Sequence, residues 1–180
     1  MSMKITELQF PGCFLIESSK FMDVRGGFVK TYHKNIFEEN GIKIDLAEEF
    51  YSVSRKDVLR GMHFQLPPSD HEKLVYCMNG SVLDVFLDIR KHSPTYGQSM
   101  GIELSGENAR TLFLPKGIAH GFLSLEDNSV MVYKTSTVHD PLKDCGIRWD
   151  SFGYPWPVSA PVISDRDTKH STFSEFNSPF

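Results

Sequence analysis

Three short segments concentrate residue types that can do chemistry. They are Arg60-Gly-Met-His63-Phe-Gln65, the pair Glu72-Lys73, and Pro115-Lys-Gly-Ile-Ala-His120-Gly121. Each histidine or cation alone is more simply a packed or surface residue. Their combination beside expected strands indicates a site, because a histidine can accept a proton near neutral pH and cations form charge-assisted hydrogen bonds with anions.

A metal site is the first alternative for these residues. Metal-binding cupin barrels use a His-x-His pair, a glutamate a few residues later and a further histidine. Here Gln65 stands where the second histidine would be, and an amide is a weak ligand for a metal that prefers imidazole. His120 alone does not complete the set, so we expect no catalytic metal.

Length and composition limit the class of protein. The 180 residues correspond to one domain, 1–180, and 40% hydrophobic with 23% charged residues is ordinary globular composition. Disordered, collagen-like and coiled-coil chains are thereby excluded. The net charge of −4, with no block of Lys or Arg, argues against a nucleic-acid partner. The 14 Phe, 6 Tyr and 2 Trp, with 13 Gly and 10 Pro, favour β structure.

The cysteines and the N-terminus indicate the compartment. Cys13, Cys77 and Cys145 are far apart, so they form neither a disulfide framework nor a metal knuckle. The first residues lack the apolar region of a signal peptide, and no apolar run approaches the roughly 20 residues that span a membrane. We expect a soluble cytoplasmic protein with no membrane partner.

Alternation of apolar and polar residues predicts many short strands. They cover residues 27–32, 49–54, 73–78, 81–89, 111–114, 119–125 and 130–136. Asn79-Gly80 between two of these runs predicts a hairpin with a type I′ turn. In the second run, Leu83, Val85 and Leu87 share one face and Asp84 lies on the other, as in a barrel with a polar interior.

The rest of the chain predicts only minor elements. One short helix is expected at residues 33–40, and the Pro- and aromatic-rich stretch from Trp149 to Pro161 should cover one edge of the strands. Residues 168–180 form a polar tail, which we expect to be poorly ordered. Many short strands at regular spacing are typical of a sandwich or a barrel.

Several blocks resemble the dTDP-4-dehydrorhamnose 3,5-epimerase family. They are Asp23-x-Arg25-Gly, Val58-Leu-Arg60-Gly-Met-His63-Phe-Gln65-Leu-Pro-Pro68 with Lys73-Leu-Val, Asp84-Val-x-Leu-Asp88-Ile-Arg90, Ser93-Pro-Thr-x-Gly97, Leu114-Pro-x-Gly-x-Ala-His120-Gly-Phe122, Tyr133-Lys and Gly146-Ile-x-Trp149. The resemblance covers residues 23–167. It implies an all-β, cupin-type double-stranded β-helix (jelly-roll) barrel with a few short helices, assembled as a homodimer and working without metal or cofactor.

The resemblance also implies a reaction. The family inverts C3 and C5 of nucleotide-linked 4-keto-6-deoxy sugars, precursors of surface polysaccharides such as lipopolysaccharide or capsule. The C4 ketone acidifies both neighbouring C–H bonds, so inversion needs a base, an enolate stabiliser and an acid. By resemblance His63 is the base and Asp167 orients and polarises it. Lys73 stabilises the charge on O4, and Tyr133 donates a proton from the opposite face.

Further positions are implied to bind the substrate. They are Arg25, Arg60, His120, Glu48, Glu49, Phe50, His139, Asp144 and Arg166. Asp144 and Arg166 replace the family's Glu and Lys, Glu48-Glu49-Phe50 replaces Gln-Asp-Asn, Lys30 replaces Glu, and His139 replaces a Tyr that stacks on thymine. The catalytic set is intact while the nucleotide surroundings differ. We therefore expect a substrate with another nucleotide or sugar, such as a GDP-linked 4-keto-6-deoxyheptose.

Three other functions stay open at this point. A sugar-nucleotide 3,4-ketoisomerase would share the barrel and the class of substrate. A binding protein without catalysis would keep Arg60 and His120 but would not need His63, Asp167 and Tyr133. A metal-dependent oxygenase is disfavoured by Gln65. Whether C3, C5 or both are inverted depends on the placement of the sugar and is not predicted.

Overall fold

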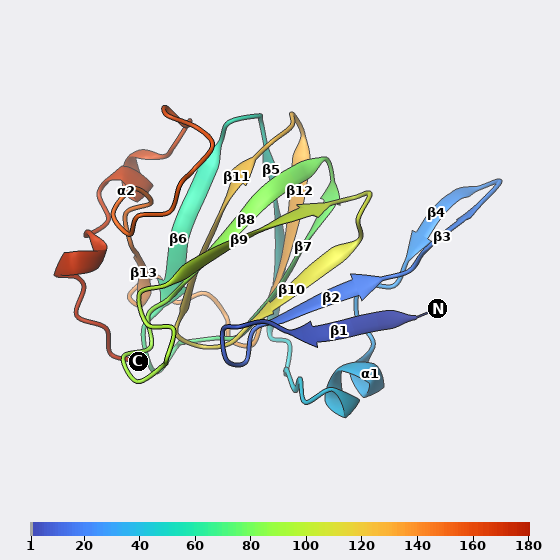
Figure 1. Ribbon diagram of the computed structural model, residues 1–180, viewed down its shortest axis with the longest axis horizontal. Helices are drawn as coiled ribbons and strands as arrows, with labels where there is room; N and C mark the ends of the chain where they lie inside the picture. Colours follow the sequence, from blue (N-terminus) through green and yellow to red (C-terminus); the bar gives the residue numbers. More distant parts are fainter. Residues whose placement is uncertain (1) are drawn as a thin grey trace.

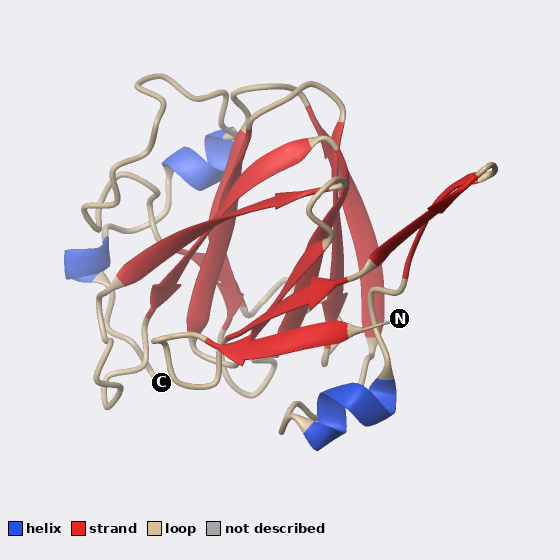
Figure 2. Ribbon diagram, turned by 45° about the vertical axis from the view of Figure 1, so that its right-hand side comes forward, coloured by secondary structure: helices blue, strands red, loops and turns tan. Residues whose placement is uncertain are grey.

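The computed structural model describes residues 2–180, which form a barrel of two facing antiparallel sheets (Figures 1 and 2). In strand order, the larger sheet comprises β1 (Met3–Glu7), β2 (Phe14–Ser18), β10 (Arg110–Leu114), β7 (Lys73–Asn79), β12 (Ser129–Thr135) and β5 (Glu48–Ser54). The smaller sheet comprises β13 (Asp144–Gly146), β6 (Leu59–Gln65), β11 (Ile118–Ser124), β8 (Ser81–Asp88) and β9 (Ser99–Ser105). The predicted all-β, cupin-type barrel is confirmed.

The chain passes from one sheet to the other at most of its turns. From β5 onward, consecutive strands alternate between the sheets, except that β8 and β9 are neighbours. The predicted hairpin at Asn79-Gly80 is therefore wrong, because β7 pairs with β10 and β12 whereas β8 pairs with β9 and β11. Gly80 has a φ of 73° but Asn79 does not have a positive φ, so the turn is a corner between sheets rather than a type I′ turn.

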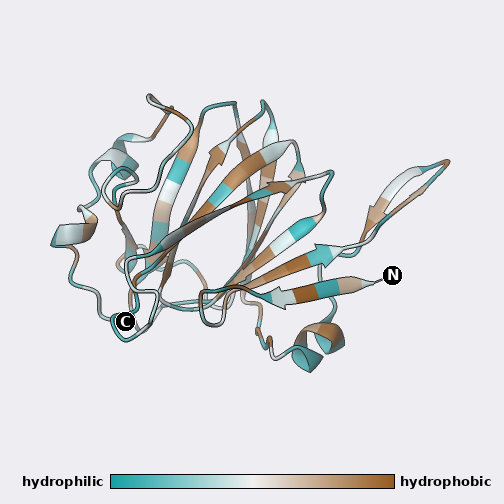
Figure 3. Ribbon diagram, in the orientation of Figure 1, coloured by the Kyte–Doolittle hydropathy of each residue, from teal (hydrophilic) through white to brown (hydrophobic). Residues whose placement is uncertain are grey.

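The barrel interior carries both the core and the site. Val82 and Phe86 of β8 pack inward with Phe122 of β11 and Met131 of β12. Asp84 lies between the two inward residues of its strand and is fully buried. The predicted alternation of β8 is confirmed, and the bands of hydrophobic and hydrophilic residues along the strands are visible in Figure 3.

The C-terminal segment covers the outer face of the smaller sheet. Tyr154 and Trp156 pack against the outward residues of this sheet, so the stretch 149–161 covers a face rather than an edge. The expectation that residues 168–180 are poorly ordered is wrong. Phe176 lies edge-on to Phe64 with ring centroids 5.1 Å apart, and Ser178 is buried. Aromatic residues spaced along this polar stretch anchor it to the barrel.

Two short helices, one 3-10 turn and a hairpin complete the structure. They are α1 (Lys34–Glu39), as predicted, α2 (Asp165–Thr168), the turn η1 (Phe173–Glu175), and the hairpin of β3 (Lys20–Asp23) with β4 (Gly26–Val29). This hairpin projects away from the barrel (Figure 1). Within residues 2–180, no helix is long and apolar enough to cross a membrane.

Candidate active site

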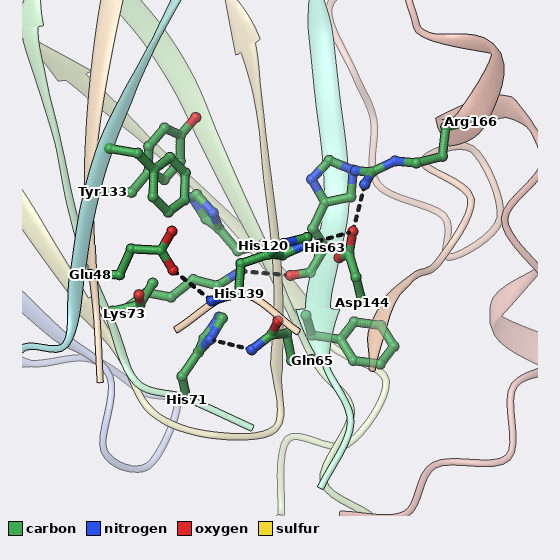
Figure 4. Close-up of a pocket in the computed structure, with 13 residues that line it drawn as sticks. Glu48, His63, Gln65, His71, Lys73, His120, Tyr133, His139, Asp144 and Arg166 are labelled. Atoms are coloured by element: carbon green, nitrogen blue, oxygen red, sulfur yellow. Dashed lines mark hydrogen bonds and ion pairs between the residues drawn. The ribbon is translucent and has the colours of Figure 1, made fainter. Parts of the chain in front are cut away.

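A pocket opens between the two sheets, and most of the predicted site residues line it. The lining consists of Glu48, Phe50, His63, Phe64, Gln65, His71, Lys73, His120, Tyr133, Thr135, His139, Asp144 and Arg166 (Figure 4). These side chains come from β5, β7 and β12 on one wall and from β6, β11 and β13 on the other, with His71 and His139 supplied by loops and Arg166 by α2. The barrel thus assembles residues that are more than 100 positions apart.

His63 is held by a buried carboxylate. Its Nε2 lies 2.9 Å from Oδ1 of Asp167, whose other oxygen accepts a hydrogen bond from the Gly61 N–H. Arg166 Nη2 also lies 2.7 Å from this Nε2 atom. In the tautomer whose Nε2–H is donated to Asp167, the lone pair of a neutral His63 is on Nδ1. Burial lowers the pKa of His63, so the ring is neutral and able to accept a proton at pH 7.

A β-bulge allows β6 to present its site residues. The pairing of β6 with β11 shifts between His120 and Phe122, so that His63 lies opposite His120 and Arg60 lies opposite Phe122. Residues three apart on a regular strand face opposite ways, but the extra residue of the bulge puts His63 and Arg60 on the same side of β6, although Arg60 is exposed and lies outside the pocket. Glycine is required here, because a Cβ at Gly61 would lie 2.5 Å from the Gly121 Cα.

Asp167 is ionised despite its burial. Burial alone would raise the pKa of this carboxyl, but the facing imidazoles of His170 and His63 hold it well below the usual range. A short helix presents the residue. Ser164 caps α2 by accepting a hydrogen bond from the Asp167 N–H. The carboxylate can therefore fix the orientation of the His63 ring and stabilise its protonated form.

Lys73 lies on the floor of the pocket. Its Nζ donates to the backbone carbonyl of His63 at 2.8 Å, and the residue is only 8% exposed. Burial lowers the pKa of Lys73 to about 8, while Asp144 and Asp84 oppose this shift. The ammonium is thus charged at neutral pH and can stabilise negative charge that develops beside it.

Tyr133 faces the pocket from the opposite wall. Its hydroxyl lies 3.2 Å from Oγ of Ser52, and its ring stacks on Phe50 with centroids 4.8 Å apart. Burial raises the pKa of Tyr133 well above its ordinary value, so the phenol keeps its proton at neutral pH. Figure 4 shows Tyr133 and His63 on opposite sides of the pocket. One pocket therefore combines a proton acceptor and a proton donor on facing walls.

His120 belongs to a second histidine–aspartate pair. Its Nε2 lies 2.8 Å from Oδ2 of Asp84, and neither side chain is more than 3% exposed. Burial raises the pKa of Asp84, and the neighbouring His120 opposes the shift. The pair fixes the His120 ring at the pocket wall, edge-on to Tyr133 at 6.1 Å between centroids.

The sequence of the whole chain matches one family of enzymes. The family profile described as dTDP-4-dehydrorhamnose 3,5-epimerase matches residues 7–175. The enzyme of that name from Shigella flexneri is 41% identical over 174 residues, which are 95% of this chain and 96% of the relative. The Escherichia coli K12 enzyme is 36% identical over 96% of each chain. This chain belongs to the dTDP-4-dehydrorhamnose 3,5-epimerase family.

Solved structures of such epimerases have the same fold. The Bacillus anthracis dTDP-4-dehydrorhamnose 3,5-epimerase, solved with TDP and PPi bound, superposes with a TM-score of 0.92 at 36% identity over 95% of this chain and 99% of that chain. A double mutant of a Streptomyces bikiniensis 3′-monoepimerase, solved with dTDP, gives 0.89 at 27% identity over 93% and 86%. The chain is thus an isomerase of the epimerase class.

Three predicted binding residues do not line the pocket of this epimerase. Arg25 is on the projecting β3–β4 hairpin, where it pairs with Asp23. Glu49 faces the other side of β5 and pairs with Lys134 at 3.0 Å, because alternate residues of a strand point in opposite directions. Arg60 lies beyond the lining residues, where its Nε donates to Oγ of Ser54.

The epimerase site also contains residues that the sequence did not indicate. They are Ser52, His71, Asp84 and His170. Burial lowers the pKa of His71 to about 3, and the ring is neutral beside Gln65 at 3.2 Å. The inward position of Asp84 was the one available signal, because a carboxyl on a core face needs a partner. Nothing in the sequence pairs His170 with Asp167.

Gln65 has a structural part in the epimerase. Its Oε1 accepts from the Asp140 N–H at 2.6 Å, and its Nε2 donates to the Ser69 carbonyl at 2.7 Å. Both ends of the amide are thereby engaged in holding the loop that carries His139. Gln65 is not free to complete the metal set of an oxygenase with His63 and His120.

Proposed function

We propose that this protein inverts C3, C5 or both of a nucleoside-diphosphate-linked 4-keto-6-deoxy sugar. The observation that carries the proposal is the opposition of His63 and Tyr133 across one pocket, with Lys73 on its floor (Figure 4). Inversion of a carbon requires that a proton leave one face and that another arrive on the opposite face. A base and an acid on facing walls suit this requirement.

The proposed reaction uses each group once for every carbon that is inverted. His63 removes the proton through Nδ1, and Asp167 stabilises the imidazolium that forms. The electrons of the C–H bond move into the ketone, and the ammonium of Lys73 stabilises the enolate oxygen. Tyr133 then protonates the carbon from the other face. His63 then releases its extra proton to solvent, and Tyr133 takes up a proton from solvent, before the next turnover.

The relatives support this reaction. The Legionella pneumophila enzyme was solved in complex with dTDP-4-keto-L-rhamnose, a nucleotide-linked keto sugar. The double mutant of the Streptomyces bikiniensis 3′-monoepimerase replaces a histidine by asparagine and a tyrosine by phenylalanine. The separation of these two residues along that chain equals the separation of His63 and Tyr133 in this one.

The nucleotide is the open part of the proposal. Glu48, Phe50 and His139 are grouped at the pocket, where the Glu48 carboxylate accepts from the His139 N–H at 2.6 Å. Because these positions differ from the dTDP pattern, we infer that the enzyme accepts another nucleotide, such as GDP. Calorimetric titration with dTDP, GDP, CDP and UDP tests this inference. Clear preference for dTDP would overturn it and leave the proposed reaction intact.

We also propose that the enzyme is a homodimer in which Arg25 serves the partner's site. The hairpin that carries Arg25 exposes Phe21, Met22 and Phe28, apolar side chains that a second copy would cover. A mixture of the His63→Ala and Arg25→Ala variants tests this. Hybrid dimers regain one intact site if Arg25 acts in the partner, whereas they stay inactive if Arg25 acts in its own chain.

The cellular setting is part of the proposal. Cys13, Cys77 and Cys145 are free thiols, which suits a reducing cytoplasm. A 4-keto-6-deoxy sugar nucleotide is a precursor of surface polysaccharides, and we place the enzyme in that biosynthesis. NMR of product formation with a panel of nucleotide 4-keto sugars tests the proposed function. Inversion at C3 or C5 supports it, whereas migration of the ketone to C3 would indicate a 3,4-ketoisomerase, and binding without turnover a non-catalytic protein.

A further inference from the structure

A second histidine faces the carboxylate that holds the proposed base. His170 follows α2, and its Nε2 lies 3.4 Å from the same Oδ1 of Asp167 that contacts His63 at 2.9 Å. The three ligand atoms all lie within 4.8 Å of one another. His170 has no part in the proposed reaction.

The position of His170 has two unusual features. A Cβ at Gly146 would lie 2.4 Å from His170 Nε2, so the ring occupies space that only glycine leaves free. The Nε2 atom is buried but has no hydrogen-bond partner. A buried polar atom without a partner is costly, so this nitrogen is available to a ligand that can reach it.

The distances from the two imidazoles to Asp167 fit a small metal ion. Zinc binds imidazole nitrogen and carboxylate oxygen at about 2.0–2.2 Å in tetrahedral geometry, which separates neighbouring ligand atoms by about 3.3 Å. The two distances to Asp167 Oδ1, 2.9 Å and 3.4 Å, bracket that separation. We propose that His63, Asp167 and His170 bind a divalent transition metal such as Zn²⁺, and that the bound ion inhibits the epimerase.

The inhibition follows from the tautomer of His63, and this step rests on the proposed function. Metal on Nε2 displaces the proton that this atom donated to Asp167. The single proton of the neutral ring then resides on Nδ1, which is the atom that must accept the proton of the substrate.

The guanidinium of Arg166 competes with a metal ion for His63 and Asp167. Its Nη2 lies 2.7 Å from His63 Nε2 and its Nε lies 3.2 Å from Asp167 Oδ1, so the guanidinium occupies the metal's side of the ring. The Arg166 side chain is 55% exposed and also pairs with Asp144 at 2.6 Å, so it can leave His63 while keeping that partner. Binding therefore requires that the Arg166 guanidinium move.

Equilibrium dialysis with Zn²⁺ against the EDTA-treated enzyme tests the site without reference to activity. We expect one ion per chain, and His170→Ala should weaken binding by at least about tenfold. The variant should lose its inhibition by Zn²⁺, measured relative to its own activity in metal-free buffer. His170→Phe, which keeps a ring in the same space, replaces it if the alanine variant does not fold. His92→Ala removes an exposed histidine elsewhere and should bind as the wild type does.

Two further results decide the inference. Arg166→Ala should bind Zn²⁺ more tightly than the wild type, and Co²⁺ in the site should give the visible absorption of a tetrahedral ion. Absence of bound metal in the wild type, or equal affinity in the His170 variants, would overturn the site. Metal binding that depends on His170 in a protein without epimerase activity would instead overturn the proposed function and leave the site standing.

Discussion

His63 and Tyr133 approach one pocket from different sheets, His63 from β6 and Tyr133 from β12 (Figure 4). Two groups on one strand could not reach opposite faces of a bound sugar. The barrel therefore places the group that removes the proton and the group that returns one on different sheets. It follows that the two half-reactions should be separable by mutation.

Loss of the Tyr133 hydroxyl should slow inversion more than it slows proton removal. We expect Tyr133→Phe to reduce the rate of inversion by about 10²–10⁴-fold, the usual contribution of a positioned acid. Exchange of the sugar protons with solvent should continue in part, because His63 is intact. NMR of both processes on one sample makes the comparison. Tyr51→Phe, on the exposed face of the neighbouring strand, is the control and should behave as the wild type. Equal losses of exchange and inversion in Tyr133→Phe would contradict its role.

The pH profile should have a limb for each of two buried groups. His63 must be neutral, and its lowered pKa places the acid limb of kcat/KM below pH 6.5. Lys73 must be charged, and its pKa of about 8 makes activity fall as pH rises above 8. Lys73→Arg keeps the charge at high pH and should remove the alkaline limb in whatever activity survives. An unchanged alkaline limb in that variant would assign the limb to another group.

Asp84 should contribute more to the free energy of unfolding than its single hydrogen bond suggests. Asp84→Ala leaves the fully buried His120 without its partner, and breaking a buried pair costs about 3–5 kcal/mol. Urea unfolding gives the free energy of unfolding. Asp84→Asn retains an acceptor for His120 and should lose less. Asp45→Ala, an exposed carboxyl, should change the free energy by no more than about 0.5 kcal/mol. If Asp84→Ala changed the free energy of unfolding by as little as Asp45→Ala does, the Asp84–His120 pair would not contribute to stability.

The corner at Gly80 should tolerate no side chain. Gly80 has a φ of 73°, and a Cβ there would lie 2.6 Å from Oγ and 2.9 Å from Cα of Ser129. Gly41 has a similar φ of 82° but open space around it, so Gly41→Ala carries the backbone cost alone, about 1–2 kcal/mol. Gly80→Ala should cost a further 1–3 kcal/mol or so for the overlap. Equal free energies of unfolding in the two variants would contradict the close packing of this corner.

The local pattern of the sequence predicts the positions of the strands and of the helix well, but it predicts poorly which strands pair with one another. The alternation along β8 placed Asp84 inward, and the residues of the short helix α1 were indicated. The partner sheet of β8 was missed, because a glycine with positive φ serves a hairpin and a corner between sheets equally well. The ordering of the C-terminal segment depends on contacts such as Phe176 with Phe64, which join residues distant in the chain.

The site residues likewise fall into those that the sequence predicts and those whose contacts depend on distant parts of the chain. His63, Lys73 and Tyr133 were indicated by motif and do line one pocket. The direction of Glu49 depends on the register of β5 with β12, which the sequence does not specify to one residue. The contacts of His170 arise where α2 meets the smaller sheet, and nothing near His170 in the sequence indicates them.

Deuterium incorporation from heavy water tests the central claim most directly. The wild type and His63→Ala would each be incubated with the 4-keto sugar nucleotide that the wild type turns over, and NMR would locate the label. The account predicts deuterium at C3, C5 or both with the wild type and none above background with His63→Ala. In that variant Asp167 still accepts from the Gly61 N–H, and Lys73 still donates to the backbone carbonyl of residue 63. Incorporation by His63→Ala at a rate near that of the wild type would contradict it.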